Sequence, residues 1–431
     1  MPEAKSGDRV KVVTKDEEFE GILMPRPEIL EKGFTVLKLD NGYNIGIEDK
    51  KIKEIKVLEK YKQKEASKTK LKVNKNLPTV SILSLGGTIS SKVDYRTGGT
   101  YADYTAEDFV AMMPELAKIA NIKAKKVMSI MSEDMNPEDW TQIAKIIADE
   151  LNSGIDGVVV TQGTDTLHFS TAAISFILRN LNKPVVFTAA QRSIDRGSSD
   201  AFMNLICAVS AAAKFDGAEV VTCLHGTTND DYCLLNRGTK VRKMHTSRRD
   251  AFRPVDELPL AKVYSDGKIE VVKKDYRKRS EKKVEADNKF EAKTALIQVY
   301  PGMEPKIIDF YVNGGYKGIV LAATALGHVP TLREKYSLMS NLKKAIDKKI
   351  PIVIASQTLY GRVHPLVYTN LRKLSVELGC IFAENMLPET AYVKLGWVLG
   401  KTKDISKVKE LMLKNIAGEI TERSDDKSFL Y

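Results

Sequence analysis

The chain has 431 residues, of which 43% are hydrophobic and 29% charged, and a formal net charge of +11. These values predict a soluble globular protein of two or three domains. No run approaches the roughly 18 apolar residues of a membrane span, and "MPEAKSGDRV" lacks a signal region, so we expect a cytoplasmic protein without membrane contact. The four cysteines show no CxxC spacing, which excludes an obvious disulfide framework or zinc site and predicts small core residues.

The N-terminal region, residues 1–59, contains five short runs that alternate apolar and polar residues. Asp40-Asn41-Gly42 lies between the third and fourth runs and tolerates the positive φ of a hairpin turn. This pattern predicts a small SH3-like β-barrel, a type of domain that more often binds or docks than catalyses. Residues 60–76 are rich in lysine, lack apolar periodicity and are expected to form a linker.

Residues 77–255 alternate strand-like and helix-like segments, which predicts a larger α/β domain with a mostly parallel sheet. Buried-strand patterns occur in "TVSILSL", "IDGVVVT", "KPVVFTAA" and "AEVVTCL", and we also expect a strand over 127–130. Asn136 and Pro137 are typical of a helix start, here of a helix through Trp140 and Ile147. A second helix is expected over 201–214.

Residues 256–294 are expected to connect this domain to the next and to carry a protruding basic hairpin. Asp266-Gly267 predicts a turn after a short strand pattern, and "KKDYRKRSEKK" at 273–283 follows the strand "KIEVV". Two interpretations are open for this hairpin, a solvated loop or a contact with nucleic acid or an acidic partner.

Residues 295–431 again alternate strands and helices and predict a smaller α/β domain. Its helices are expected over 332–346, 366–378 and 389–399, between the strands "TALIQVY", "GIVLAA", "IPIVIASQ" and "CIFA". The predicted fold is therefore α/β, a small N-terminal β-barrel followed by a pair of α/β domains with mostly parallel sheets.

Polar motifs follow three of the predicted strands of the larger domain, where parallel α/β sheets bind their ligands. They are Gly86-Gly87-Thr88, Ser132-Glu133-Asp134 and Gln162-Gly163-Thr164-Asp165-Thr166. Gly87 and Gly163 let the backbone approach a ligand closely, and a threonine beside such amides can attack a carbonyl whose oxyanion they stabilise. A tight turn or a phosphate cradle remains an alternative for the first motif.

Other kinds of site find little support in the sequence. Neither GxxxxGK[ST] nor GxGxxG occurs, which argues against nucleotide binding, and GxSxG is absent. The five histidines show no arrangement that marks a general base, and His168 is expected to be structural. We expect no metal site and no cofactor in this chain.

The combination of motifs resembles the asparaginase and glutaminase family of amidohydrolases. The resemblance covers residues 77–413 and rests on "SLGGTIS", "DYRTGGTY", "SIMSEDMNPEDW", "VVVTQGTDTLHFS", "VVFTAAQRS" and "VRKMHTSRRDAF" in this order. It implies an asparaginase-like pair of α/β domains in which the second domain completes a neighbouring subunit's site.

The resemblance also implies roles for individual residues. Thr88 would be the nucleophile, assisted by Tyr95 of a flexible lid. Thr164, Asp165 and Lys243 would form a second catalytic set, with Asp165 also facing the substrate's amino group.

Ser132 would hold the substrate's α-carboxylate. Glu133 stands where many relatives carry glutamine, so its contact with the substrate is expected to differ. Three alternatives stay open: Lys240 as the catalytic lysine, Ser132 as a turn serine, and Tyr95 as a packed loop aromatic.

The added barrel, linker and basic hairpin resemble the D-subunit family of archaeal glutamyl-tRNA(Gln) amidotransferases. This resemblance implies that the chain releases ammonia from glutamine, while a partner, the E subunit, activates Glu-tRNA(Gln) with ATP and Mg²⁺ and uses the ammonia. It also implies a homodimeric core with two E subunits, a heterotetramer. Two alternatives remain. One is a stand-alone L-asparaginase, since asparagine and glutamine differ by only one methylene. The other is a non-catalytic RNA-binding or scaffold protein.

Overall fold

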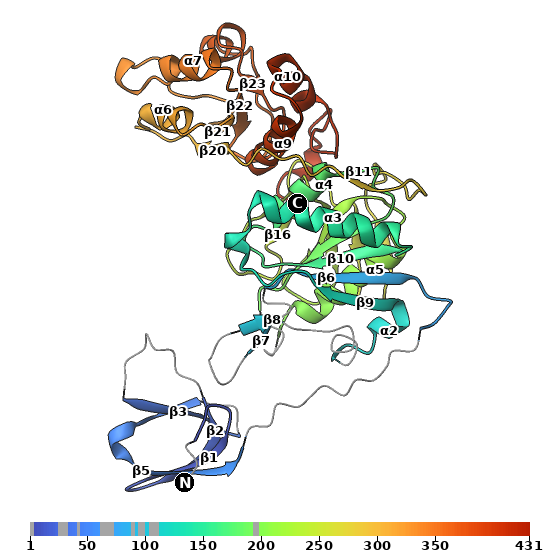
Figure 1. The fold of residues 1–431 in the computed structure, drawn as a ribbon, viewed down its shortest axis with the longest axis vertical. Helices are drawn as coiled ribbons and strands as arrows, with labels where there is room; N and C mark the ends of the chain where they lie inside the picture. The colour runs from blue at the N-terminus through green and yellow to red at the C-terminus, as the bar shows by residue number, and fades with distance from the viewer. Residues whose placement is uncertain are drawn as a thin grey trace.

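The structure is a computed structural model that describes residues 4–24, 33–40, 44–60, 73–87, 91–93, 100–102, 112–192 and 198–431. Thr88 and Tyr95, the proposed nucleophile and lid residue, lie outside the described residues, as does most of the predicted linker. Figure 1 shows the fold coloured from the N-terminus to the C-terminus.

The N-terminal region forms the five short strands that its alternating pattern predicts. They are β1 (Arg9–Thr14), β2 (Glu18–Leu23), β3 (Phe34–Lys38), β4 (Asn44–Glu48) and β5 (Ile52–Glu59), with the 3-10 turn η1 (Asp49–Lys51) before β5. The antiparallel sheet has the order β4-β3-β2-β1-β5, so β5 pairs with β1. Among the described residues β4 and β5 do not pair, and closure into a barrel stays a prediction. Val10, Val12, Leu37 and Ile47 are the buried centre of this region.

The larger domain is built on an eight-stranded sheet with the order β18-β17-β14-β13-β12-β10-β6-β9. Its strands are β6 (Thr79–Ser84), β9 (Asn121–Lys126), β10 (Gly157–Thr161), β12 (Val185–Thr188), β13 (Val220–His225), β14 (Cys233–Arg237), β17 (Ala261–Val263) and β18 (Ile269–Val271). Five neighbouring strands run parallel, in the sheet order β9-β6-β10-β12-β13. At the β13 side, β14, β17 and β18 add antiparallel pairs. The expectation of a mostly parallel α/β sheet is confirmed.

Helices cover both faces of this sheet. One face packs against α3 (Pro137–Asn152) and α4 (Leu167–Ile177), and the other against α2 (Leu116–Ile119) and α5 (Ala201–Lys214). The bounds of α5 match the sequence prediction. The start of α3 is fixed by a capping box, in which Asn136 and Asp139 each accept the other's backbone N–H, and by Pro137 at the first helical position.

The strand expected over 127–130 is not found. The strand next to β6 is β9, which ends at Lys126, and the chain then turns across the end of β6. The N–H groups of Val127 and Met128 both donate to the carbonyl of Ser84, at 2.9 and 3.3 Å. Val127 packs against the core from a turn, which explains why an apolar residue there resembled part of a strand. The sequence did not predict β9 because only two of its residues that pack on the core, Ile122 and Ala124, are apolar.

Short paired strands complete the larger domain and its connection. They are β7 (Ser91–Val93) with β8 (Thr100–Ala102), β11 (Leu178–Arg179) with β19 (Glu285–Ala286), and β15 (Val241–Lys243) with β16 (Phe252–Pro254).

The basic segment 273–283 does not protrude as a hairpin tip. Arg277 pairs with the buried Glu219 at 2.8 Å, and Lys278 pairs with Asp216 at 2.6 Å. Arg279 donates to the backbone carbonyls of Phe215, Asp156 and Ala212. The sequence expectation was wrong because these cations bind acidic side chains and backbone carbonyls, among them those at the end of α5, that are distant in the sequence.

The smaller domain contains a four-stranded parallel sheet with the order β20-β21-β22-β23. Its strands are β20 (Thr294–Gln298), β21 (Gly318–Ala323), β22 (Ile352–Ser356) and β23 (Ile381–Phe382). The core on one face involves α6 (Lys306–Asn313), α7 (Met339–Asp347) and α8 (Thr369–Arg372), and the core on the other involves α9 (Pro388–Lys401) and α10 (Ile405–Leu413).

Two predicted helices of this domain are shorter than expected. Residues 332–338 contain only the 3-10 turn η4 (Glu334–Tyr336), and α7 begins at Met339. In 366–378, a single α turn passes into the π-helical turn Lys373–Glu377, which an apolar period alone does not reveal.

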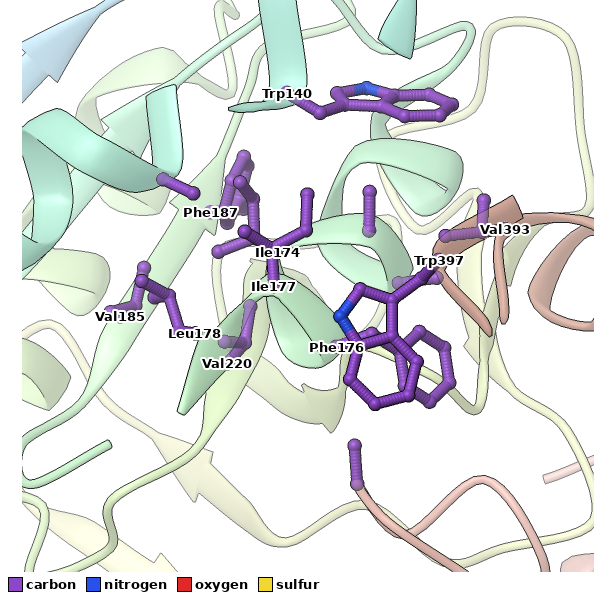
Figure 2. Packing of buried hydrophobic residues seen from close by; sticks show 14 of the residues in the cluster. Trp140, Ile174, Phe176, Ile177, Leu178, Val185, Phe187, Val220, Val393 and Trp397 are labelled. Carbon is purple, nitrogen blue, oxygen red and sulfur yellow. The ribbon is translucent and has the colours of Figure 1, made fainter. Parts of the chain in front are cut away.

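One hydrophobic cluster spans both α/β domains. Ile174, Phe176 and Ile177 of α4 lie near Val393 and Trp397 of α9 in this cluster (Figure 2). Phe176 and Trp397 stack with ring centroids 5.9 Å apart. The two domains therefore share an apolar interface between α4 and α9. No helix in the described ranges is long and apolar enough to cross a bilayer.

All four cysteines are buried and unpaired, as expected of small core residues.

Candidate active site

Three loops meet backbone to backbone at the carboxyl ends of the parallel strands, and glycines make this contact possible. Gly86 and Gly87, which follow β6, have φ angles of +106° and +81°. A Cβ on Gly86 would lie 2.8 Å from the carbonyl oxygen of Ile130, and one on Gly87 would lie 2.5 Å from the backbone nitrogen of Gly163. Any side chain at either position would separate the loops.

Ser132 lies at the centre of this contact and is only 3% exposed. It begins the 3-10 turn η3 (Ser132–Asp134), and its Oγ accepts a hydrogen bond from the backbone N–H of Asp165 at 3.2 Å. Thr166 Oγ1 donates to the carbonyl of Ser132 at 2.5 Å. A Cβ on Gly163 would lie 2.8 Å from Ser132 Oγ, so the third glycine is required for the same reason.

Lys243 reaches two side chains at the N-terminal end of α4. Its Nζ donates to Thr164 Oγ1 at 2.8 Å and to Asp165 Oδ1 at 2.7 Å. The lysine side chain is 10% exposed, whereas Asp165 is 64% exposed. The pairing of β15 with β16 sets Lys243 opposite Phe252 and fixes its backbone. The result is a buried amine joined to a hydroxyl and to an open carboxylate.

Lys240 is directed elsewhere. Its Nζ donates to the backbone carbonyl of Asn385 in the smaller domain at 2.7 Å, and the residue is 1% exposed. Desolvation lowers the pKa of Lys240 to about 8, against the opposing effect of Asp256, Glu257 and Glu419. Of the two candidate lysines, Lys243 is the one that contacts Thr164 and Asp165.

His168 lies on the first turn of α4, close to these groups. Burial, followed by the positive charges of Arg242 and Lys243, lowers the pKa of His168 to about 3. Its ring is therefore neutral at physiological pH, and none of the residues that the structure describes forms a hydrogen bond with its Nδ1. The ring packs on Phe169 with centroids 4.7 Å apart, which agrees with a structural role.

The structure brings together six of the sequence-predicted site residues: Gly87, Ser132, Gly163, Thr164, Asp165 and Lys243. Glu133 shares the turn of Ser132 but is exposed, and in the part of the chain that the structure describes no hydrogen bond or ion pair joins it to the others. Thr88 and Tyr95 belong to the undescribed stretches.

Sequence reasoning missed two supports of the site. Thr166 bonds the Ser132 loop directly, and its presence as the second threonine of the motif 162–166 was the available signal. Asp200 is fully buried and accepts the backbone N–H groups of Gln191 and Arg192, which follow β12 next to the site strand β10. An aspartate directly before the well-predicted helix 201–214 was its signal.

The arrangement suits hydrolysis of a small polar substrate. Buried backbone amides and a serine hydroxyl can hold an anionic or carbonyl oxygen, and the joined lysine, threonine and aspartate can move a proton. No cluster of three or more metal-ligating side chains occurs in the described ranges.

Comparisons with known families cover most of the chain. Residues 79–277 match "Asparaginase, N-terminal" and residues 293–412 match "Glutaminase/Asparaginase C-terminal domain". Residues 4–58 match "GatD N-terminal domain".

Two curated relatives align over nearly the whole length. The D subunit of glutamyl-tRNA(Gln) amidotransferase from Pyrococcus furiosus is 53% identical over 430 residues, covering 98% of this chain and 97% of that protein. The protein of the same name from Thermococcus kodakarensis is 50% identical, covering 98% of this chain and 96% of that protein. Among solved structures, the thermostable L-asparaginase from Thermococcus kodakarensis is 28% identical with a TM-score of 0.71, covering 80% of this chain and 100% of that one.

Proposed function

The chain belongs to the family of glutamyl-tRNA(Gln) amidotransferase D subunits, and from that premise we propose that it is the glutamine-hydrolysing component of such an enzyme. It releases ammonia from glutamine, and the ammonia converts Glu-tRNA(Gln) to Gln-tRNA(Gln) on a partner. The asparaginase-like pair of domains supplies the amidohydrolase, and the N-terminal domain distinguishes this chain from the L-asparaginase it resembles.

One observation carries the proposal, the bonding of Lys243 Nζ to both Thr164 and Asp165. The lysine ammonium can pass a proton to the carboxylate of Asp165 and then take the hydroxyl proton of Thr164. This relay activates a hydroxyl group or a water molecule without any histidine. The exposure of Asp165 leaves its second oxygen open to a substrate amino group.

We assign the nucleophile to Thr88 and the assisting lid residue to Tyr95. The Thr88 oxygen bonds to the side-chain amide carbon of glutamine, the C–N bond breaks, and the Thr88 proton leaves with the nitrogen as ammonia. Water then cleaves the ester, giving glutamate and regenerating the hydroxyl. Ser132 holds the α-carboxylate of the substrate, and the backbone at Gly87 and Gly163 lines the pocket.

The remaining steps belong to the complex and not to this chain. The partner, the E subunit, binds ATP and Mg²⁺ and activates the glutamyl carboxylate of the tRNA. We propose a homodimeric core of this chain with two E subunits, acting in the cytoplasm. Glu133 then contributes to substrate choice at the amino end.

The test is a glutamine-dependent amidation assay on the complex of the full chain with the E subunit. Wild type should form Gln-tRNA(Gln) and release ammonia, and Thr88→Ala or Thr164→Ala should abolish both while leaving the complex intact. Retained ammonia release in both variants contradicts the assigned chemistry. No release by wild type in any condition favours a non-catalytic scaffold.

The structural similarity to an L-asparaginase favours a second candidate, hydrolysis of free asparagine. Asparagine turnover by the isolated chain separates the two functions. Brisk turnover without partner or tRNA supports the stand-alone asparaginase, and glutamine hydrolysis that depends on the complex supports the amidotransferase function.

A further inference from the structure

The segment 237–243, which ends in Lys243, lies between the two α/β domains. Residues 238–240 form a turn, closed by the N–H of Lys240 donating to the carbonyl of Arg237, and β15 (Val241–Lys243) follows it. In a strand successive side chains point to opposite sides, so Val241 and Lys243 share one side of β15 and Arg242 takes the other. Val241 packs in the shared core and Lys243 reaches Thr164, whereas Lys240 and Arg242 contact the smaller domain.

Both contacts with the smaller domain are short, and Lys240, Asn385 and Glu389 are buried while Arg242 is partly exposed. Lys240 Nζ donates to the carbonyl of Asn385 at 2.7 Å. Arg242 Nη2 lies 3.0 Å from Glu389 Oε1, with 31% and 8% of the two side chains exposed. Such buried charges are costly unless paired, so the segment cannot move away from the smaller domain without exposing or orphaning them.

Backbone contacts reinforce the same connection. Thr239 is fully buried; its Oγ1 donates to the carbonyl of Ala417 at 3.0 Å, and its own carbonyl accepts from Thr390 Oγ1 at 3.0 Å. The residues before Lys243 are thus held by two separate parts of the smaller domain, 385–390 and the tail near 417.

The partners of Lys240 and Arg242 on the smaller domain, Asn385 and Glu389, lie just before α9 and in its first turn. Helix α9 in turn packs against α4. Glu389 is in the first turn of α9, and Thr164 and Asp165 immediately precede α4. Figure 2 shows Trp397 and Val393 of α9 beside the α4 side chains. The smaller domain therefore contacts both sides of the Lys243 site, through the segment 237–243 and through α4.

We propose that Arg242 and Lys240 are positioning residues, which fix the amine of Lys243 against Thr164 and Asp165 by binding that segment to the smaller domain. Glutamine hydrolysis in the larger domain then depends on the seating of the smaller domain, and a partner that shifts the smaller domain changes the activity. The inference rests on the proposed function because it assigns Lys243 a catalytic role.

The geometry leaves little tolerance for displacement. The bonds from Lys243 are 2.8 and 2.7 Å long, so a shift of about 1 Å breaks both of them, and a misplacement of that size can cost about 100-fold in rate. Within the described ranges Glu389 Oε2 finds no hydrogen-bond partner, and Arg242 provides a charged contact to Oε1 that keeps this carboxylate in place.

The test is a double-mutant cycle on the rate of ammonia release, using Arg242→Met and Glu389→Gln in the full chain bound to the E subunit. We expect each single variant to lower kcat by about 10 to 100-fold with little change in KM, and the double variant to be no worse than the poorer single one. Arg242→Lys keeps the charge and should restore part of the rate.

A matched pair elsewhere serves as the control. Lys401 of α9 pairs with Asp287, with 30% and 20% of the side chains exposed, and does not touch segment 237–243. Lys401→Met and Asp287→Asn should leave kcat unchanged even where they lower stability.

The outcomes separate this inference from the proposed function. If Lys243→Met abolishes ammonia release while Arg242→Met and Lys240→Met leave kcat unchanged, the contacts are only structural and the inference is wrong. If Lys243→Met itself is fully active, the proposed function fails first. Should Arg242→Met not fold, Glu389→Gln, which preserves the side-chain shape, decides by the same criteria.

Discussion

The two α/β sheets differ in what their polar side chains bind at the carboxyl ends of the parallel strands, called here the edge of each sheet. At the larger sheet, Lys243 bonds to Thr164 and Asp165 across glycine-lined loops. At the smaller sheet, Gln357 Nε2 donates to the carbonyls of Val299 and Ala322, at 2.8 and 3.3 Å. The first edge joins ionisable side chains to one another, and the second uses its polar side chain to satisfy the backbone.

This difference shows that the architecture alone does not create a site. Both edges have the strand-to-helix loops where α/β proteins bind ligands, and both have glycines with positive φ. Only a set of groups that bond to each other, with one open to solvent, offers chemistry to a substrate. The predictions below test whether the contrast between the edges is one of chemistry or only of packing.

The largest difference between the two sheets should come from removing one hydroxyl group that follows a strand in each of them. Thr164→Val removes the hydroxyl that Lys243 binds, and kcat for glutamine should fall by about 10² to 10⁴-fold. Thr324→Val removes a hydroxyl that donates to the carbonyl of His328, and it should leave kcat unchanged. Steady-state ammonia release measures both, and equal losses would erase the contrast between the edges.

A second comparison uses two glycines with the same φ of +81°, Gly87 and Gly302. Gly87→Ala places a Cβ 2.5 Å from the Gly163 nitrogen, whereas Gly302→Ala meets nothing within 4 Å. Both variants should lose about 1 kcal/mol to the left-handed backbone, and Gly87→Ala should lose a further 2 kcal/mol, roughly, through the clash. Urea unfolding reports both values; similar losses would mean that the loops do not need their close contact.

A third test uses the histidine buried at the larger edge. The pKa of His168 is lowered to about 3, so between about pH 6.5 and about pH 3 the unfolded chain binds a proton that the folded chain does not. Stability should therefore fall with decreasing pH by about 1.4 kcal/mol per unit from this residue alone. The difference in unfolding free energy between wild type and His168→Gln, measured from pH 7 to pH 4, should show that slope. A flat difference contradicts the burial argument.

The smallest effect is expected at the smaller edge. Gln357→Met removes the donor that serves the carbonyls of Val299 and Ala322, and should cost about 1 to 2 kcal/mol of unfolding free energy. Because no proton relay is involved, kcat should stay within about twofold of wild type. A large loss of kcat with unchanged stability would show that this edge also takes part in catalysis.

Much of the fold was predictable because local patterns dominate it. The helix over 201–214 has the predicted bounds because its apolar residues repeat at helical spacing, and the start of α3 follows from Asn136 and Pro137. The strand expected over 127–130 failed because an apolar turn and an apolar strand have the same composition. The basic segment failed because charge alone does not reveal whether Glu219 and Asp216 lie beside it.

The site was predictable in its motifs and not in its connections. Gly87 and Gly163 follow strands and were identified from that position, whereas Ser132 was identified from the strand wrongly expected over 127–130; the structure explains all three by the close contact of their loops. Lys243 lies 78 residues from Asp165 in the chain, a separation that no local spacing can interpret, and it entered only through the family resemblance. Thr166 was missed because its partner is a backbone carbonyl of another loop, and Asp200 because its partners are backbone N–H groups, which no side-chain pattern marks.

The sequence by itself determined the alternation of strands and helices, the glycine-rich loops and the kinds of side chain present at the site. The tertiary structure decided which lysine meets Thr164. Lys240 and Lys243 are three residues apart, but one binds a carbonyl 145 residues away in the smaller domain and the other binds the larger domain. Lys240 belongs to the turn before β15 and Lys243 to the strand itself, and only the packing of the two domains determines what each side chain meets.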